Sequence, residues 1–218
     1  GRLPAAPVAF LNLGGVGNIS WVDPTAPAPE TAGACVAFDT GPANAPLNDL
    51  MRRRRRQSRD EGGALAASGT ADQGIVAAFL DDPWFRRPAP KSLDRDQFAG
   101  LTRAVAPLSD ADAAATLVSA LAGSVAAGMA WLPALPAQVL VCGGGRHNAA
   151  IMDALAAALP VPVRPVEAIG LNGDMLEAQA FGWLAVRVLR GLPISGPMTT
   201  GVPAPVCGGR ISHPRSRD

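Results

Sequence analysis

The chain has 218 residues, enough to bury a core as one domain or to form one lobe of a larger protein. Its 19 basic and 18 acidic side chains give a formal net charge of +1, and 48% of its residues are hydrophobic. This balance is typical of soluble globular proteins and gives no electrostatic reason to expect nucleic acid or an anionic membrane as partner.

The cysteines and the N-terminal residues bear on the cellular location of the protein. Cys35, Cys142 and Cys207 are far apart and lack CxxC spacing, so they predict neither a disulfide framework nor a zinc site. A reducing cytoplasm is the simplest location. Serine and glycine interrupt the apolar stretch 117–132, and no signal peptide opens the chain, so we expect no membrane span and no export. The first residue is Gly1 rather than Met, which favours a truncated sequence.

The first half of the chain predicts a hairpin, a third strand and two helices. Apolar and β-branched runs, glycine turns and helical periodicity are the signals. We expect strands at 8–13, 18–22 and 33–38, an exposed loop at 24–29, and helices at 44–56 and 63–80. Pro83, Pro88 and Pro90 then exclude regular structure until about Phe98.

The second half predicts a long capped helix followed by alternating strands and helices. Ser109, the acidic Asp110 and an apolar pattern to Leu132 indicate an N-capped helix. A strand, a glycine turn and a helix follow, an order typical of phosphate or nucleotide sites in α/β proteins. The expected elements are a strand at 138–142, a helix at 148–159, an edge strand at 161–166, a helix at 174–190 and an extended tail after residue 191.

The first hairpin carries Gly14, Gly15 and Gly17, followed by Asn18, in the sequence LNLGGVGNIS. A turn without β-carbons lets backbone N–H groups approach phosphate oxygens and form a concave anion site. The alternative is a tight structural turn, for which glycine is equally suited.

A carboxylate follows the third predicted strand in the sequence FDTGPAN. Asp39 stands there at the expected strand end, beside Thr40 and a Gly-Pro turn that leads to Asn44 and a helix. Ligands bind at strand ends in α/β sheets, where a carboxylate can serve as base or metal ligand. The alternative is an N-cap, since Asp before such a turn often accepts from backbone donors.

Three successive glycines follow the strand at 138–142 in the sequence VLVCGGGRHN. Gly143, Gly144 and Gly145 allow close approach of a flat ring or a phosphate, and Asn148 can cap the next helix or bind a ligand. A structural turn is the alternative, but three glycines cost more folding entropy than a plain turn requires.

The remaining charged and titratable residues carry weaker signals. Glu177, near the start of an apolar helix, either interacts with the helix dipole or projects towards a site. His147 and His213 are too few and too separated for a metal cluster, and we treat both as non-ligands. The arginines at 52–56 lack interleaved aromatic residues, so we interpret them as a solvated helix end rather than a nucleic-acid site.

The order of the motifs resembles the anhydro-N-acetylmuramic acid kinase family. The resemblance extends from about Phe10 to about Gly209, and the segments that carry it are LNLGGVGNIS, AFDTGPANAPLNDL, DEGGALAASG, PAPKSLDRDQF, LSDADAAATL, VLVCGGGRHNAAIMDAL, MLEAQAFGWLAVRVLRGLP and PMTTGV.

This resemblance implies an α/β fold: one lobe of a sugar-kinase/actin/heat-shock ATPase, ribonuclease H-like, with a mixed sheet flanked by helices. Family members use ATP and Mg²⁺ to convert 1,6-anhydro-N-acetylmuramic acid and water into N-acetylmuramic acid 6-phosphate, in cell-wall recycling. The implied chain is a C-terminal nucleotide-binding lobe at 1–209, with a disordered tail at 210–218. The resemblance allows a homodimer, and it implies no nucleic-acid or membrane partner.

The resemblance also implies roles for the motif residues. By match to the family's DTGPGN motif, Asp39 is the catalytic base that deprotonates the attacking water. The ATP-binding residues would be Gly14, Gly15, Gly17, Asn18, Gly143, Gly144, Gly145 and Asn148, and the sugar-binding residues Asp39, Thr40, Asn44 and Glu177. No metal ligand is assigned.

Three features depart from the family pattern. Ala43 stands where the family has Gly, and Asn48 where it has an acidic residue. No GTMSGTS-like segment, part of the family's N-terminal phosphate loop, occurs in the chain, so we expect the N-terminal lobe to be a missing partner and the fragment to turn over poorly. A nucleotide-binding lobe without catalysis and a different sugar kinase of the same superfamily are the alternatives.

Overall fold

The chain folds around a five-stranded mixed sheet. The structure, a computed structural model, describes residues 5–94 and 96–212. The strands are β1 (Val8–Leu13), β2 (Val16–Val22), β3 (Cys35–Pro42), β4 (Val139–Cys142) and β5 (Val163–Pro165). Their order is β3-β2-β1-β4-β5, with β1 antiparallel to β2, β2 antiparallel to β3, and β4 and β5 parallel to β1. This confirms the predicted mixed sheet, in the strand order of a ribonuclease H-like fold.

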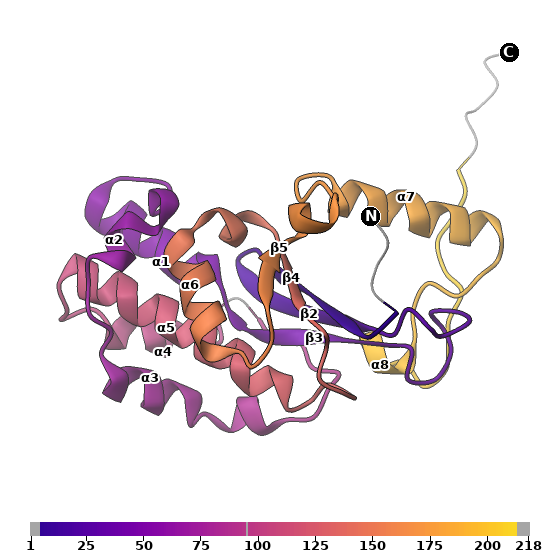
Figure 1. The fold of residues 1–218 in the computed structure, drawn as a ribbon, viewed down its shortest axis with the longest axis horizontal. Coiled ribbons are helices and arrows are strands. Elements are labelled where there is room, and N and C mark those ends of the chain that lie inside the picture. Colours follow the sequence, from indigo (N-terminus) through magenta and orange to yellow (C-terminus); the bar gives the residue numbers. More distant parts are fainter. Residues whose placement is uncertain (1–4, 95, 213–218) are drawn as a thin grey trace, which may run out of the picture.

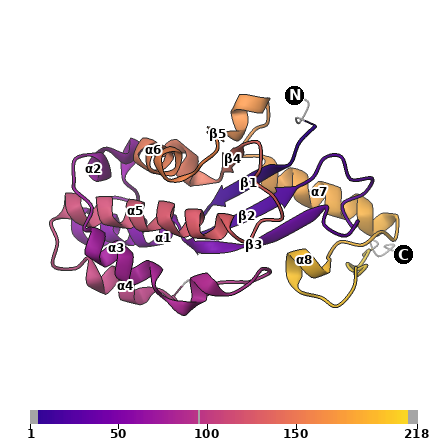
Figure 2. The ribbon, with the colours of Figure 1, turned by 60° about the horizontal axis from the view of Figure 1, so that its bottom comes forward.

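Helices form a layer on one face of this sheet. In chain order, the helices of the described residues are α1 (Asn44–Leu50), α2 (Ala64–Ala67), α3 (Gln73–Leu80), α4 (Ala99–Ala104), α5 (Asp110–Met129), α6 (Ala149–Ala158), α7 (Leu176–Leu189) and α8 (Pro197–Thr200). Single 3-10 or π turns occur at Met51–Arg55, Glu61–Gly63, Pro83–Arg86, Gly144–His147 and Val166–Ile169. In the layer α5 lies across the sheet and contacts α2, α3, α6 and β3 (Figures 1 and 2). The helix α7 stands apart from this layer in both views.

Alternating side chains decide which face of the sheet is covered. Leu11, Ile19 and Phe38 lie in register on β1, β2 and β3, and each is at most 2% exposed beneath the helices. Because successive strand side chains point to opposite faces, the neighbouring Asn12 and Asn18 point to the other, more open face. The core therefore lies between the sheet and the helical layer. On the other face the row of Asn12 and Asn18 is polar, and the neighbouring row contains Phe10 and Leu140.

The central helix α5 confirms the most clearly signalled element of the sequence. The Ser109 hydroxyl accepts from the Asp112 backbone N–H at 3.1 Å and caps the first turn. By length and hydropathy α5 meets the criteria for a membrane span, and 61% of that stretch is buried inside this chain. Its small residues Ala113, Ala114 and Ala120 are fully buried and let neighbouring elements approach closely.

The predicted helix at 63–80 is wrong as one element. It is split, because α2 ends at Ala67 and α3 begins at Gln73, with Asp72 capping α3 through the Ile75 N–H at 3.0 Å. Contacts with α5 keep the segment between α2 and α3 out of a helical conformation. Gly69 lies against the backbone of residue 111, with no room for a side chain. Local helix propensity yields here to packing against a distant segment.

Other boundaries also differ from the sequence prediction. The expected helix at 44–56 is confirmed as α1 continued by a π turn, which ends at Arg56 in a left-handed conformation. The helix α4 was not predicted, and the proline segment before it contains a short 3-10 turn. The tail after residue 191 is not simply extended, since it forms α8 and an isolated bridge between Ser195 and Val206. His213 and the rest of the expected tail at 213–218 lie outside the described residues.

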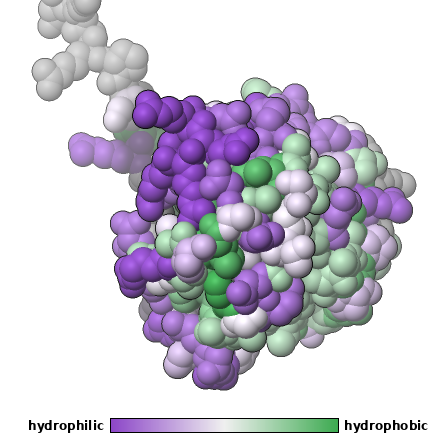
Figure 3. Space-filling model, turned by 90° about the vertical axis from the view of Figure 1, so that its left-hand side faces the viewer, coloured by the Kyte–Doolittle hydropathy of each residue, from purple (hydrophilic) through white to green (hydrophobic). Residues whose placement is uncertain are grey.

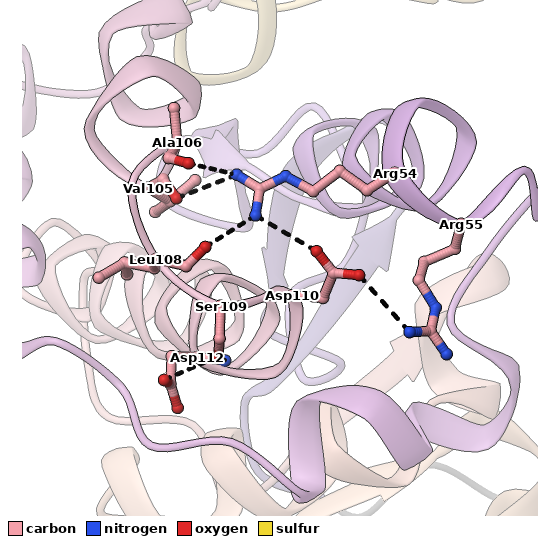
Figure 4. A network of polar contacts seen from close by, with 8 residues as sticks. All are labelled: Arg54, Arg55, Val105, Ala106, Leu108, Ser109, Asp110 and Asp112. Carbon is pink, nitrogen blue, oxygen red and sulfur yellow. Dashed lines mark hydrogen bonds and ion pairs between the residues drawn. The ribbon is translucent and has the colours of Figure 1, made fainter.

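The arginine run is only partly the solvated helix end that the sequence suggested. The Arg54 side chain is 26% exposed and crosses to the segment between α4 and α5 (Figure 4). It donates to the carbonyls of Ala106 and Leu108 at 2.8 and 2.9 Å, and to the Asp110 carboxylate at 3.4 Å. Arg55 reaches the same carboxylate at 3.5 Å. Arg54 thus joins the π turn after α1 to the α4–α5 connection and to the start of α5, which a solvated side chain does not do.

The surface differs between the two ends of the molecule. At the end that carries α2, hydrophilic side chains gather on one side of the surface and weakly apolar side chains cover much of the other (Figure 3). By contrast, α7 exposes large apolar side chains, including Phe181 at 66%, Trp183 at 50% and Leu189 at 67%. Several large apolar side chains exposed on one helix are typical of an interaction surface.

Candidate functional site

The first glycine hairpin and the start of α1 are joined by hydrogen bonds. The backbone N–H groups of Ala43 and Asn44 donate to the carbonyls of Gly15 and Gly14 at 3.0 and 2.9 Å. The Asn44 side-chain amide donates to the Leu13 carbonyl at 2.8 Å. The hairpin turn and the α1 N-terminus therefore form one rigid corner, and Asn44 is part of what holds it.

The second glycine turn packs directly on this corner. Gly143 has a φ of +75°, and a β-carbon there would come within 2.5 Å of the Asn12 side-chain oxygen. A β-carbon on Gly145 would lie 2.6 Å from that of Leu13 and 3.0 Å from the Asn44 side-chain oxygen. Both positions thus require glycine, one by conformation and contact and the other by contact alone. The tertiary structure brings together the glycine motifs at 14–17 and 143–145.

Asp39 lies inside β3, so the prediction that it ends a strand is wrong. The pairing shifts between Gly17 and Asn18, which leaves Thr40 as an extra residue in a β-bulge. The Asp39 carboxylate accepts from the Asn18 side-chain amide at 3.0 Å and from the Leu93 backbone N–H at 2.7 Å. The alternative N-cap role is also wrong, because these groups hold the carboxylate and Ala43 stands at the cap of α1.

A polar row crosses the open face of the sheet at Asp39. The strand registers pair Cys142 with Asn12, Asn12 with Asn18, and Asn18 with Asp39. Paired residues point to the same face, so the four side chains stand side by side across β4, β1, β2 and β3. Burial raises the pKa of the Cys142 thiol, which favours its neutral form. Sequence reasoning missed Asn12 and Cys142, although the alternation of β1 signals an outward-pointing Asn12.

Three other predicted site residues lie in different surroundings. Thr40 is 1% exposed, and its hydroxyl faces Gly17 within the covered layer, away from the polar row. Asn148 is 7% exposed and caps α6 by accepting from the Ile151 N–H at 3.0 Å. Glu177 is exposed on the first turn of α7, and within 5–94 and 96–212 no hydrogen bond or ion pair joins it to the other predicted site residues. The ligand roles of all three remain predictions.

A hollow of about 200 Å³ adjoins the second glycine turn. It lies between α1, the Glu61–Gly63 turn and the Gly144–His147 turn, and its lining includes Asn44, Asn48, Glu61, Gly144 and His147. This is the carboxyl end of β4, where ligands bind in open α/β sheets. A second hollow of about 190 Å³, on the proline-lined side of α1, is lined by none of the predicted site residues.

Arg146 is a buried charged residue that sequence reasoning passed over. Its guanidinium donates to Glu167 at 3.0 Å, to Asp174 at 2.7 Å and to the Gly143 carbonyl at 2.9 Å. Burial disfavours its charge, but the hydrogen bonds to Asp174 and Glu167 outweigh burial and raise the pKa of the guanidinium. The same contact lowers the pKa of Asp174. No local signal separates this arginine from a solvated one, since its partners follow 21 and 28 residues later.

No cluster of three or more His, Cys, Asp or Glu side chains in the described part of the chain could hold a metal ion. Mg²⁺ seldom uses an all-protein cage and is usually bound through one or two carboxylates together with substrate phosphates. The side chains present therefore fit Mg²⁺ only as an ion carried with a nucleotide.

Comparison with known proteins decides the family. The model of the family described as anhydro-N-acetylmuramic acid kinase matches residues 3–214. The chain belongs to this family. It is 62% identical over 212 residues to anhydro-N-acetylmuramic acid kinase 1 of Jannaschia sp. (strain CCS1), covering 97% of this chain and 56% of that protein.

Other relatives of this family show the same partial coverage. The chain is 62% identical to the enzyme of Cereibacter sphaeroides over 96% of its own length and 57% of the relative's. For the Caulobacter vibrioides relative the identity is 51%, with 95% and 53% covered. The chain thus spans about half the length of the curated relatives it matches.

A solved structure, the activator of the 2-hydroxyisocaproyl-CoA dehydratase from Clostridium difficile with bound ADPNP, also matches. The TM-score is 0.43 at 14% identity, over 78% of this chain and 62% of that chain. A similarity of this size carries no argument about the site.

Proposed function

We propose that this chain is the nucleotide-binding part of an ATP-dependent kinase that converts 1,6-anhydro-N-acetylmuramic acid and water into N-acetylmuramic acid 6-phosphate. The observation that carries the proposal is the Asp39 carboxylate, held by Asn18 and the Leu93 N–H on the open face beside two packed glycine turns. Membership of the kinase family supports the same assignment.

The proposed reaction needs a base that activates water and an oxygen atom of the sugar that accepts the phosphoryl group of ATP. Asp39 takes a proton from water as the water oxygen bonds to the anomeric carbon. The bond from that carbon to the bridging O6 breaks, and O6 takes the γ-phosphoryl group from ATP, which leaves ADP. Both carboxylate oxygens already accept a hydrogen bond, so the group is fixed in direction before substrate arrives.

The glycine corner suits the nucleotide. Phosphates would lie against the backbone of Gly14 and Gly15, since Gly15 is exposed and a glycine has no β-carbon to keep a phosphate away from its backbone. The nucleoside would lie along Gly143–Gly145, with the hollow lined by Asn48 and Glu61 next to it. Mg²⁺ bound with the phosphates would neutralise their charge during transfer.

The departures at Ala43 and Asn48 do not weaken the geometry at Asp39. Ala43 keeps its place in the glycine corner, since its backbone N–H donates to the Gly15 carbonyl at 3.0 Å. Asn48 lines the hollow beside α1 rather than the polar row. Its amide offers both a donor and an acceptor to a bound base, where the family's acidic residue offers only acceptors.

The rest of the polypeptide is part of the proposal. The helix α7 exposes Phe181, Trp183 and Leu189. We propose that the portion of the full-length protein that this chain lacks packs against these apolar side chains. The relatives are nearly twice as long as the matched segment, so their remaining residues are enough to form a second lobe. Phosphoryl transfer requires reacting groups assembled between lobes, and we therefore expect this chain alone to bind ATP but to turn over poorly. We assign the reaction to the cytoplasm and to cell-wall recycling.

The test is phosphoryl transfer from ATP to the anhydro sugar by the full-length protein that contains this chain, with Asp39→Asn as the variant. We expect kcat to fall by about 100-fold or more, the range for loss of a general base, while ATP affinity is kept. Unchanged kcat in the variant would refute the role of Asp39. ATP binding without transfer in the unaltered full-length protein would instead support a nucleotide-binding lobe without catalysis.

A further inference from the structure

Arg146 connects the second glycine turn to the start of α7. Its side chain is 4% exposed, and each guanidinium nitrogen has its own acceptor. Nη1 donates to the Gly143 carbonyl, Nε to Glu167 and Nη2 to Asp174. A planar guanidinium holds three acceptors in a fixed arrangement, whereas a lysine ammonium is a single point charge on a flexible stem.

The contacts around Gly143 leave the backbone of the second glycine turn little conformational freedom. Gly143 is in a left-handed conformation and is pressed against the Asn12 side chain and the Leu13 carbonyl, with no room for a β-carbon. Its own carbonyl is the atom that Arg146 binds at 2.9 Å. A displacement of the guanidinium would therefore move the peptide that opens the glycine turn.

The segment that precedes α7 packs equally closely against the Arg146 guanidinium. A β-carbon on Gly173 would lie 2.5 Å from the Arg146 Nε, so this backbone lies flat against the guanidinium. The Gly173 N–H also donates to Glu167 at 3.1 Å, which fixes the same carboxylate that Arg146 binds. Asp174 then lies three residues before Glu177, on the segment that leads into α7.

We propose that Arg146 is a positioning residue that holds the Gly143–Gly145 turn in its nucleotide-binding shape and couples this shape to the segment leading to Glu177. The inference rests on the proposed function, since it takes the turn to be the nucleotide site. The guanidinium of Arg146 is occupied by Gly143, Glu167 and Asp174, so its proposed effect on the nucleotide is through the shape of the turn. Its exposed partner Asp174 lies outside the turn, and its closest polar contact is the hydrogen bond from Arg146 at 2.7 Å, so a change at Asp174 tests the turn through Arg146.

The first test substitutes Arg146→Lys in the full-length protein and measures the ATP dissociation constant by calorimetry, together with KM and kcat. We expect ATP affinity to weaken about tenfold, equivalent to about 1.4 kcal/mol, and KM for ATP to rise more than kcat falls. The matched control is Arg164→Lys, which makes the same change at an exposed residue of the edge strand β5 and should leave ATP affinity unchanged.

A second pair of variants keeps the test decisive if Arg146→Lys does not fold. Asp174→Asn removes one of the two carboxylate charges that bind Arg146, and Asp153→Asn makes the same change at an exposed site on α6. We expect only the first to weaken ATP binding, by about threefold. A lower melting temperature with unchanged ATP affinity in both Arg146→Lys and Asp174→Asn would overturn the proposal. Failure of the unaltered protein to bind ATP would refute the proposed function instead.

Discussion

The side-chain amide of Asn18 donates a hydrogen bond to the carboxylate of Asp39, at 3.0 Å, between neighbouring strands that meet at a β-bulge. Asn18 belongs to the glycine motif that the sequence assigned to ATP, yet its amide is directed at the proposed base. The β-bulge causes this contact. Because Thr40 is an extra residue in β3, Asp39 rather than Thr40 lies opposite Asn18. One side chain therefore has two candidate roles that kinetics can separate.

Replacing Asn18→Ala tests those two roles in the full-length protein. If the amide positions the base, kcat should fall about tenfold or more with KM for ATP nearly unchanged, since only the orientation of Asp39 is lost. Steady-state kinetics at varied ATP gives both constants. A raised KM for ATP with normal kcat would assign Asn18 to the nucleotide instead. In Asn18→Asp two carboxylates would adjoin, so the pH optimum should move upward.

Replacing Gly143→Ala should destabilise the chain by roughly 1–3 kcal/mol, because the new β-carbon meets Asn12 and the residue must keep a positive φ. Urea unfolding followed by circular dichroism measures the change. The matched control is Gly182→Ala in α7, where nothing lies within 4 Å of the new β-carbon. That variant should gain about 0.5–1 kcal/mol from helix propensity. Equal effects at the two sites would contradict the packing described for Gly143.

An Arg54→Ala substitution should destabilise the fold by about 1–2 kcal/mol, since the carbonyls of Ala106 and Leu108 lose a donor and Asp110 keeps only the longer contact with Arg55. Arg52→Ala is the control, because Arg52 is 55% exposed and pairs within its own helix. Thermal unfolding should separate the two variants clearly. A melting temperature for Arg54→Ala as high as that of the control would show that the Arg54 network contributes nothing.

Acid stability should depend on Asp112. The backbone N–H of Thr70 and the hydroxyl of Ser109 donate to its carboxylate, and these bonds lower its pKa. A carboxyl group with a depressed folded-state pKa stabilises the fold above its unfolded pKa, and this contribution is lost as pH falls through the folded value. Urea midpoints measured from pH 6 to pH 2 should therefore fall less steeply in Asp112→Asn than in the unaltered chain.

The control for this pH dependence is Asp153→Asn on the exposed face of α6, which should keep the slope of the unaltered chain. Identical slopes for all three proteins would exclude Asp112 as a source of acid sensitivity.

Much of the local structure was determined by the sequence alone. The alternating strands of the hairpin, the Ser109 cap of α5 and the strand, glycine turn and helix at 139–158 are all formed as predicted. Each depends on neighbours within about five residues, through side-chain period, capping hydrogen bonds or glycine conformation. Such signals need no knowledge of the rest of the chain.

The tertiary structure alone decided how these parts make a site. The bulge at Thr40, the Leu93 N–H that reaches Asp39 from 54 residues away, and the burial of Arg146 depend on strand register and on packing between distant segments. The break in the predicted helix at 63–80 has the same origin, because contacts with α5 outweigh local propensity. Local preferences amount to tenths of a kcal/mol per residue, whereas close packing and buried hydrogen bonds contribute more.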